Sequence, residues 1–247
     1  MHIESPSMRS IADASLYLFA HQDDEFGVMH QIEKEIKSGF EVYCVFATTG
    51  VAFDENPKNR NEESLKVLTS LGVARKNIFF MGEALGISDG NVSTCGLIFR
   101  QWLLTWLQKC QSLTTIYIPA WEGGHTDHDA LHALTIETIP NNCPEITLWQ
   151  YPLYNSEGLK WGFFRVLAPL HGNGYVHYEN IPWVARWRYL QLCLSYKSQF
   201  KSWLGLFPFV LWHYLFRGCQ SLQLTSHTRI KERPHSGELY YEFRNRP

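Results

Sequence analysis

Two short polar clusters contain side chains of the kinds that bind metal ions and transfer protons. Their members are His21, Asp23 and Asp24 in the stretch AHQDDE, and His125, Asp127 and His128 in the stretch HTDH. Neighbouring carboxylates repel one another, and burying them costs solvation free energy. A divalent cation offsets that repulsion, so a metal site would explain why the chain gathers them.

The spacing within the clusters favours a zinc site. His21 and Asp24 are three positions apart, as are His125 and His128, and at the first turn of a helix such a pair points to one side. Imidazole nitrogens and carboxylate oxygens are ordinary zinc ligands, and three of them plus a water make a catalytic site. We predict that His21, Asp24 and His128 supply this set.

The remaining members are suited to proton transfer. A carboxylate such as Asp23, beside a zinc-bound water, can take the proton of that water. A histidine held by an aspartate, as His125 and Asp127 would be, can donate a proton or stabilise an oxyanion. Together these residues provide the groups that metal-assisted hydrolysis requires.

Each cluster alone also has a structural interpretation. Aspartates that follow a strand can cap the next helix, where the positive end of the helix dipole favours them. The stretch HTDHD can likewise be the solvated start of a helix. Glu25 is the member of the first cluster that we expect to be purely structural. The metal-site interpretation therefore depends on whether the fold brings the two clusters together.

The elements around the first cluster predict such a fold. Residues 15–20 and 41–48 are short apolar runs typical of buried strands. Between them, the apolar residues of 26–36 recur at helical spacing, and Gly39 marks the end of that helix. A strand, a helix and a second strand in this order form the βαβ unit of a parallel sheet.

The alternation of helices and strands continues along the chain. Helices are predicted at 60–71, 96–110 and 128–139, and strands at 77–82, 114–120 and 145–154. This pattern predicts a three-layer α/β/α sandwich with a mainly parallel sheet. Both polar clusters directly follow predicted strands, so they would share the edge at which open parallel sheets bind ligands.

The alternation of helices and strands becomes less regular after about residue 153. A helix at 184–200 and a short strand at 235–244 are expected within a stretch rich in Gly, Trp and Pro. We interpret the chain as one domain over 1–247, with a core at about 14–153 and a cleft-forming portion at about 154–247. The Trp and Tyr rings of this portion suit the apolar faces of a sugar, and they equally suit a packed core.

Composition disfavours several classes of protein. With 19% charged residues and a net charge of -2, the chain has no overall excess of positive charge, so no nucleic-acid partner is expected. The six cysteines form no CxxC or CxxxC pair, which argues against a cysteine zinc site, and their density is too low for a disulfide scaffold. The N-terminal segment has no basic-plus-apolar signal pattern. We therefore expect a reducing, cytoplasmic location.

No apolar run is long enough for a transmembrane helix. The nearest, residues 203–216, is fourteen residues long and is interrupted by Pro208 and His213. We interpret it as a core or substrate-cleft segment. The alternative is an interfacial contact with lipid or with a lipid-linked substrate, which would place the protein peripherally at the inner face of a membrane.

Both polar clusters resemble the signatures of a known family. AHQDDE is similar to the AHPDDE signature, and HTDH to the HPDH signature, of the PIG-L or LmbE-like zinc-dependent N-deacetylases. RNEESLKVLTSLGV resembles the family's R-x-x-E helix, which places Arg60 and Glu63, and YKSQ and the late ELYYEF also look similar. The resemblance covers most of the chain and is weaker around 155–185 and 200–225.

The resemblance implies an activity and a role for each site residue. Family members remove acetyl groups from N-acetylglucosaminyl conjugates and related amino sugars, on a Rossmann-like fold. The zinc ligands would be His21, Asp24 and His128, with Fe²⁺ as an alternative metal. The other roles would be general base for Asp23, a position near the oxyanion for His125, orientation of that histidine for Asp127, and substrate contact for Arg60. The alternative for Arg60 is a helix-start arginine paired with Glu63.

Two positions depart from the family signatures. Gln22 and Thr126 stand where the family usually has proline. Proline presets φ, so both loops lose some preorganisation. Neither change removes a metal ligand, so both affect the identity of the substrate more than the catalytic residues.

We predict a metal-dependent N-deacetylase that hydrolyses the acetamido group of an N-acetylated sugar, small or lipid-linked, and releases acetate. Asp23 would take the proton of the attacking water, and Asp127 would favour the imidazolium form of His125 beside the oxyanion. The alternatives are an amidohydrolase for a non-sugar amide and a catalytically silent sugar-binding protein of the same fold. A nucleotide-binding protein is disfavoured because no GxGxxG follows the first strand. The sequence predicts neither the acceptor sugar nor the oligomeric state.

Overall fold

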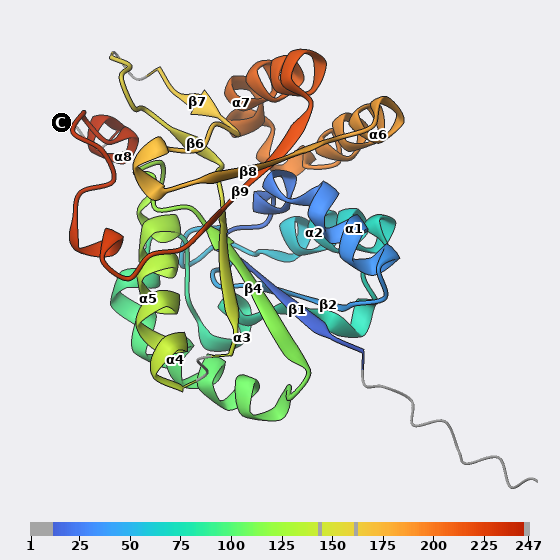
Figure 1. Cartoon of the computed structure of the whole chain (residues 1–247), viewed down its shortest axis with the longest axis vertical. Coiled ribbons are helices and arrows are strands. Elements are labelled where there is room, and N and C mark those ends of the chain that lie inside the picture. Colours follow the sequence, from blue (N-terminus) through green and yellow to red (C-terminus); the bar gives the residue numbers. More distant parts are fainter. Residues whose placement is uncertain (1–11, 143–144, 161–162, 245–247) are drawn as a thin grey trace, which may run out of the picture.

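The computed structural model describes residues 12–142, 145–160 and 163–244; Cys143 and most of the N-terminal segment discussed above lie outside these residues. At the centre is a seven-stranded sheet with helices on both faces (Figure 1). Its strand order is β3 (Ile78–Phe80), β2 (Glu41–Phe46), β1 (Ala14–Phe19), β4 (Leu113–Pro119), β5 (Thr147–Tyr151), β9 (Cys219–Leu224) and β8 (Val176–Asn180).

The sheet is mainly parallel. β1 pairs in parallel with β2 on one side and with β4 on the other, and β3 and β5 continue this arrangement. β9 and β8 are added in antiparallel orientation beyond β5. The predicted three-layer α/β architecture is therefore confirmed. Because the chain first builds the sheet towards β3 and then returns to the other side of β1, a crevice opens at the carboxyl ends of β1 and β4.

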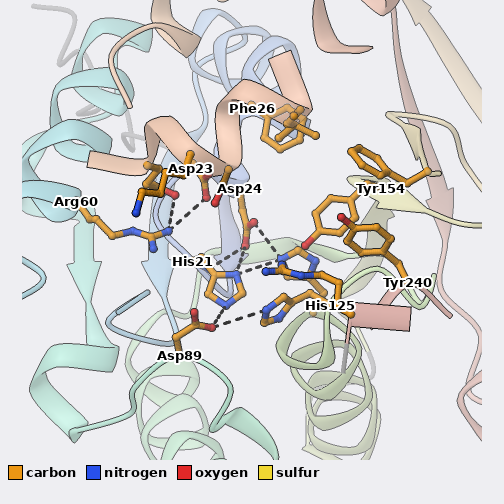
Figure 2. A pocket seen from close by; sticks show the side chains of 17 residues that line it. His21, Asp23, Asp24, Phe26, Arg60, Asp89, His125, Tyr154 and Tyr240 are labelled. Carbon is orange, nitrogen blue, oxygen red and sulfur yellow. Dashed lines mark hydrogen bonds and ion pairs between the residues drawn. The ribbon is translucent and has the colours of Figure 1, made fainter. Parts of the chain in front are cut away.

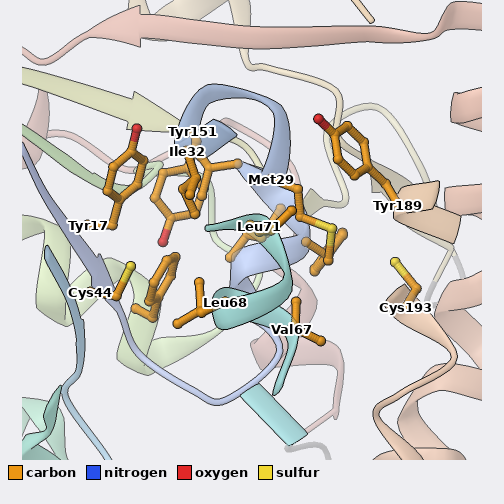
Figure 3. Close-up of a cluster of buried hydrophobic side chains, with 14 of the residues drawn as sticks. Tyr17, Met29, Ile32, Cys44, Val67, Leu68, Leu71, Tyr151, Tyr189 and Cys193 are labelled. Carbon is orange, nitrogen blue, oxygen red and sulfur yellow. The ribbon is translucent and has the colours of Figure 1, made fainter. Parts of the chain in front are cut away.

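Helices bury both faces of the sheet. One face is covered by α1 (Met29–Lys37), α2 (Lys58–Leu71), α6 (Trp183–Cys193) and α7 (Phe200–Trp212), and the other by α3 (Met81–Leu85), α4 (Val92–Lys109) and α5 (Thr126–Asn142). Alternate residues of β1 enter different cores: Phe19 and Tyr17 join the first, where Figure 3 shows Tyr17, and Leu16 and Leu18 join the second. Because both faces are covered, the strand is an uninterrupted apolar run in the sequence.

The C-terminal portion differs from the prediction. The helix expected at 184–200 is divided, because α6 ends at Cys193 and α7 begins only at Phe200. The strands β8 and β9 are not predicted, since their sequences VHYEN and CQSLQL contain few consecutive apolar residues. They complete the central sheet, so the two portions of the chain share one sheet. No helix within the described ranges is long and apolar enough to cross a membrane.

The short strand expected at 235–244 is wrong, because Tyr240–Arg244 form the helix α8. The Tyr240 ring contacts the rings of Tyr154 and Phe164, with centroids 5.7 and 5.1 Å away. Tyr154 belongs to a two-stranded ribbon, β6 (Tyr154–Asn155) with β7 (Arg165–Val166), outside the main sheet. These ring contacts, rather than the local alternation of residues, decide the conformation of the segment.

Candidate active site

The first polar cluster lies at the carboxyl end of β1, where the chain turns sharply. Asp23 has a φ of 123°, a value that non-glycine residues rarely adopt. Such strain persists only where surrounding contacts impose it, and it is concentrated at functional sites. Here Glu25 accepts a hydrogen bond from the Asp23 N–H at 3.0 Å. Glu25 does not line the cavity described below, in keeping with the structural role expected for it.

Gln22 fixes the same turn from the other side. Its buried side chain donates to the Thr48 carbonyl at 3.2 Å and to Asn61 Oδ1 at 2.7 Å. These bonds connect the turn to the end of β2 and to α2. They supply by hydrogen bonding the positional restraint that a proline would supply through its ring.

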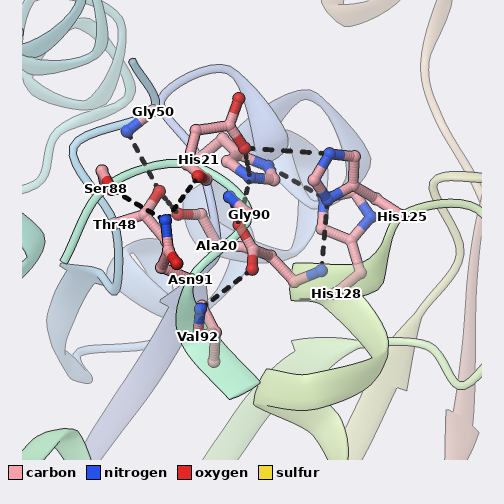
Figure 4. Close-up of polar contacts among 12 residues, drawn as sticks. Ala20, His21, Thr48, Gly50, Ser88, Gly90, Asn91, Val92, His125 and His128 are labelled. Atoms are coloured by element: carbon pink, nitrogen blue, oxygen red, sulfur yellow. Dashed lines mark hydrogen bonds and ion pairs between the residues drawn. The ribbon is translucent and has the colours of Figure 1, made fainter. Parts of the chain in front are cut away.

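The second cluster lies in the loop after β4 and in the first turn of α5. Asp129 closes this loop by accepting the N–H groups of Glu122 and Gly123 at 3.1 and 3.2 Å. Gly124 is required by packing, because a Cβ there would lie 2.1 Å from the carbonyl oxygen of Tyr154. The helix then presents His128 towards the end of β1 (Figure 4).

His21, Asp24 and His128 converge in the crevice. His128 Nε2 lies 3.3 Å from His21 Nδ1 and 3.0 Å from Asp24 Oδ1. Donor atoms about 2.0–2.1 Å from a tetrahedral zinc ion are about 3.3 Å from one another, so these three side chains fit such an ion. All three are buried, and all three line the same cavity.

A second group of possible ligands overlaps the first: His21, Asp89, His125 and Asp127. In this group Asp127 is already engaged by the N–H groups of Gly90 and Val92, at 2.6 and 3.0 Å. Asp127 is also absent from the residues that line the cavity, so an ion bound there would be less open to substrate. Of the two groups, His21, Asp24 and His128 are therefore the better candidate for a metal site that is open to substrate.

The electrostatics of the crevice favour a cation. Burial alone would lower the pKa of His21, but hydrogen bonds to Asp127 and Asp89 and the charge of Asp24 raise it well above its ordinary value. For Asp24, the nearby His128 and His21 outweigh burial and lower the pKa to about 2. A metal ion would replace the proton that the carboxylates hold on His21.

Asp23 faces the cavity beside this set (Figure 2). Trp203 Nε1 donates to its Oδ2 at 2.9 Å, and Arg60 Nη2 lies 3.7 Å from its Oδ1. Burial raises the pKa of Asp23 to about 8, with Arg60 opposing the rise and Asp24 and Glu25 adding to it. Since a cation in the crevice would lower this pKa, the carboxylate is suited to accept a proton near neutral pH.

Asp127 does not hold the His125 ring as expected. Its carboxylate lies 3.1 Å from His21 Nε2 and accepts the two N–H groups named above, so it orients His21 instead. Only its backbone N–H reaches His125, donating to Nδ1 at 3.2 Å. The expected orienting role of Asp127 therefore applies to a metal ligand.

His125 is neutral in this arrangement. Burial lowers its pKa to about 3, and the charges of His21 and His128 act in the same direction. Because Nδ1 accepts a hydrogen bond, the ring proton resides on Nε2. The lowered pKa does not favour the imidazolium form expected from the sequence; it favours a neutral ring that donates through its Nε2–H.

Arg60 points into the site and does not pair with Glu63. Its guanidinium donates to the carbonyl oxygens of Gly50 and Gln22 and to Gln199 Oε1. Glu63 accepts hydrogen bonds from Ser198 instead, at 2.9 Å from its N–H and 2.6 Å from its hydroxyl. The fold therefore places Arg60 beside Asp23 and in the lining of the cavity described below.

Asp89 is a site residue that sequence reasoning missed. Its Oδ1 lies 3.1 Å from His21 Nε2 and 3.8 Å from His125 Nε2. The only local signal is SDGN, a pattern typical of a turn, and it lies far from both clusters along the chain. Trp203 begins the segment interpreted as core or substrate cleft, and Gln199 ends the YKSQ stretch. Neither was given a role, since only the tertiary fold brings them to Asp23 and Arg60.

These groups surround one cavity of about 480 Å³. Opposite the carboxylates, its wall contains aromatic rings, and the rest of the lining includes two cationic side chains besides Arg60. The rings are Phe26, Tyr154, Phe164 and Tyr240, and the cations are Lys201 and Arg244. A few convergent polar groups facing an apolar wall are typical of small-molecule sites.

Glu122 is a buried carboxylate behind the site whose titration should affect stability. It accepts the N–H groups of Leu153 and Tyr154 at 2.6 and 2.9 Å, yet burial raises its pKa to about 8. Between about pH 5 and 8 the folded protein then binds a proton that the unfolded chain has released, so stability falls as pH rises. We expect Glu122→Gln to reduce this loss by a few kcal/mol, on the order of 2–4.

The measurement is urea unfolding of metal-free protein at pH 5.5 and 8. The exposed Glu62→Gln is the matched control and should follow the wild type. Parallel pH profiles for wild type and Glu122→Gln would show that Glu122 stays ionised in the fold.

Comparisons with known proteins are consistent with this geometry. A family model described as PIG-L, GlcNAc-PI de-N-acetylase, matches residues 16–139, a range that contains both polar clusters. A sequence comparison with curated proteins finds no match.

Several solved structures share the fold. An N,N'-diacetylchitobiose deacetylase from Pyrococcus horikoshii has 19% identity and a TM-score of 0.65, with 91% of this chain and 88% of that chain covered. A teicoplanin deacetylase in its zinc-inhibited form has 14% identity and a TM-score of 0.63, with 86% and 98% covered. A 4-carboxy-2-hydroxymuconate hydratase from Pseudomonas putida has 14% identity and a TM-score of 0.53, with 86% and 95% covered. Since one neighbour is a hydratase, the fold alone does not assign the reaction.

Proposed function

This chain belongs to the PIG-L family, as its two signatures predict, and from that premise we propose that it is a metal-dependent N-deacetylase of N-acetylated amino sugars or glycoconjugates. The observation that carries the proposal is the convergence of His21, Asp24 and His128 beside Asp23 in one cavity. Two of the structural neighbours named above are deacetylases, one of them acting on N,N'-diacetylchitobiose, which supports the same reaction here.

His21, Asp24 and His128 would hold the metal, with Asp127 orienting His21 through its carboxylate. A divalent ion bound there lowers the pKa of water towards about 7 and polarises the amide carbonyl. We propose zinc, with Fe²⁺ as the alternative. The nitrogen and oxygen donors and their spacing support either ion.

Asp23 is the proposed general base. As the water oxygen bonds to the acetyl carbon, its proton passes to the Asp23 carboxylate, which Trp203 and Arg60 hold in place. His125 donates its Nε2–H to the developing oxyanion. When the carbon–nitrogen bond breaks, Asp23 returns the proton to the departing nitrogen, because neutral His125 has no second proton to give. The products are acetate and a free amine.

The cavity suits a sugar substrate. The aromatic wall provides faces on which an apolar pyranose surface packs, and the carboxylates opposite accept hydroxyl protons. Lys201 and Arg244 would bind an anionic group on the substrate, such as the phosphodiester of a lipid-linked sugar.

We propose that the reaction takes place in the cytoplasm. The cysteine pattern of the sequence and the free cysteines in the described part of the fold support this location.

The experiment that tests the proposal measures acetate and amine release from two substrate panels. The metal-loaded protein is incubated with N-acetylglucosamine conjugates and, separately, with N-acyl amino acids. We expect equal amounts of acetate and amine from the sugars, with kcat/KM at least about tenfold above that for the amino acids. A preference for the amino acids would assign a non-sugar amide. Sugar binding without acetate release would assign a silent sugar-binding protein.

Arg60→Gln should move the pH dependence of the reaction. Arg60 lowers the pKa of Asp23, so losing its charge raises that pKa further. Because a base acts only when ionised, the rise of kcat/KM with pH should shift upward by about 0.5–1 unit. Arg60→Lys, which keeps the charge, should shift it less. A changed KM with an unshifted profile would mean that Arg60 only contacts substrate.

A further inference from the structure

Helix α7 presents a continuous apolar stripe to solvent. Its members recur every four residues from the start of the helix through the π-helical turn that follows it: Phe200, Leu204, Pro208, Trp212 and Phe216. Phe200, Leu204 and Phe216 are each 66% exposed, and Trp212 is 61% exposed. Residues four apart lie on one face of a helix, so these side chains form a single surface rather than scattered contacts.

The opposite face of α7 accounts for its attachment to the fold. Trp203 and Val210 are buried in the first core, and Tyr214 continues that contact in the π-helical turn. The stripe is therefore not needed to hold the helix on the domain. A helix on the surface of a domain usually exposes polar side chains. The apolar side chains on the exposed side of α7 therefore need a separate explanation.

The charges around the stripe indicate which kind of partner binds to it. Residues 181–231 contain seven Lys or Arg and no Asp or Glu, in a chain whose net charge is -2. Lys201 and Arg217 flank the stripe at its two ends, and both are exposed. Neither forms an ion pair with any residue in the described part of the chain. The adjoining helix α6 exposes Trp183 and Trp187, each 55%, and is also free of carboxylates.

We propose that α7 is an interfacial helix that docks the protein onto a membrane surface containing anionic lipids. Apolar and Trp side chains enter the boundary between headgroups and acyl chains, while the flanking cations contact lipid phosphates. Figure 1 places α6 and α7 together at one end of the molecule, away from α4. Lys201 also lines the cavity, but the five residues of the stripe do not, so vesicle binding through the stripe can be tested apart from the proposed deacetylation.

The test is co-sedimentation with vesicles of phosphatidylcholine containing about one third phosphatidylglycerol. We expect the wild type to bind these vesicles and to bind pure phosphatidylcholine several-fold more weakly. The double variant Leu204→Ser with Trp212→Ser should lose about tenfold or more in the partition coefficient. Both side chains are exposed and neither lines the cavity, so the fold should be unaffected.

The matched control is Leu97→Ser on α4, which covers the other face of the sheet. Leu97 is a helical leucine with 79% exposure, and its substitution should leave vesicle binding unchanged. Failure of the wild type to sediment with the anionic vesicles would overturn the proposal, as would equal binding by the double variant. A dimer detected by light scattering, absent in the double variant and without vesicle binding, would assign the stripe to a second copy of the chain.

Discussion

Asp23→Asn should lose most turnover while keeping its metal. Asparagine has nearly the same shape, tolerates the positive φ found here and can still accept the Trp203 N–H at 2.9 Å. It cannot accept the proton of the attacking water. We expect kcat to fall by a factor of about 10²–10⁴, the contribution typical of a general base. The metal content should remain that of the wild type, because His21, Asp24 and His128 are untouched.

The same substitution should make the metal-free protein more stable. Burial raises the pKa of Asp23 to about 8, so the folded state is penalised when this carboxyl ionises. Asparagine carries no charge, so its stabilising effect should vanish below about pH 4, grow between about pH 4 and 8 and be complete above about pH 8. A loss of activity accompanied by a gain in melting temperature cannot be ascribed to misfolding.

The control for Asp23 is Glu25→Gln, which removes the charge of a neighbouring buried carboxylate. Glu25 does not line the cavity, and the glutamine oxygen can still accept the Asp23 N–H. Its kcat should stay within a few-fold of the wild type. Unchanged turnover in Asp23→Asn would refute the base assignment.

His128→Ala should abolish metal binding and reduce activity to background. His128 supplies the nitrogen that lies closest to both other ligands, at 3.3 Å from His21 Nδ1 and 3.0 Å from Asp24 Oδ1. Loss of one of three ligands leaves a site that cannot compete with water and buffer for the ion. Added zinc should raise the melting temperature of the wild type, since it binds only the folded state, and should not raise that of the variant.

The control for His128 is His213→Gln. His213 is also buried, but it bonds the Cys219 carbonyl at 2.8 Å and does not line the cavity. This variant should keep one equivalent of metal by elemental analysis, whatever its stability. If His128→Ala also kept one equivalent, the ion would belong to the overlapping group of His21, Asp89, His125 and Asp127.

The sequence was most informative where local pattern and tertiary burial agree. β1 is apolar throughout because both faces of the sheet are covered, and that run directly precedes His21. The turn after β1 and the first turn of α5 then place their polar residues at neighbouring strand ends. Spacing, the shared edge of the predicted sheet and the resemblance to the family signatures together therefore pointed to His21, Asp24 and His128 as one group.

What could not be predicted depends on contacts between distant segments. Asp89 occurs in an ordinary turn sequence, and only the packing of that turn against His21 gives it a place in the site. Asp127 was assigned to its near neighbour His125, whereas the fold directs its carboxylate to His21, more than a hundred residues away. The segment of α8 alternates as a strand would, but ring contacts of Tyr240 with Tyr154 and Phe164 favour a helix.

Gln22 shows how a departure from a family signature can be accommodated. The sequence indicates only a lost proline and a less restricted loop. In the structure its amide bonds Thr48 and Asn61, and its carbonyl accepts from Arg60 at 3.0 Å. The residue therefore joins the turn that carries Asp23 to the arginine that modulates the pKa of that carboxylate.

The most direct test of a single catalytic metal is titration of chelator-treated protein with zinc or Fe²⁺, with acetate release from an N-acetylglucosamine conjugate as the readout. We predict no acetate from the metal-free protein and a linear rise in rate that ends at one equivalent of metal. Full activity in the chelator-treated protein, or no acetate at any equivalence with either ion, would contradict the account.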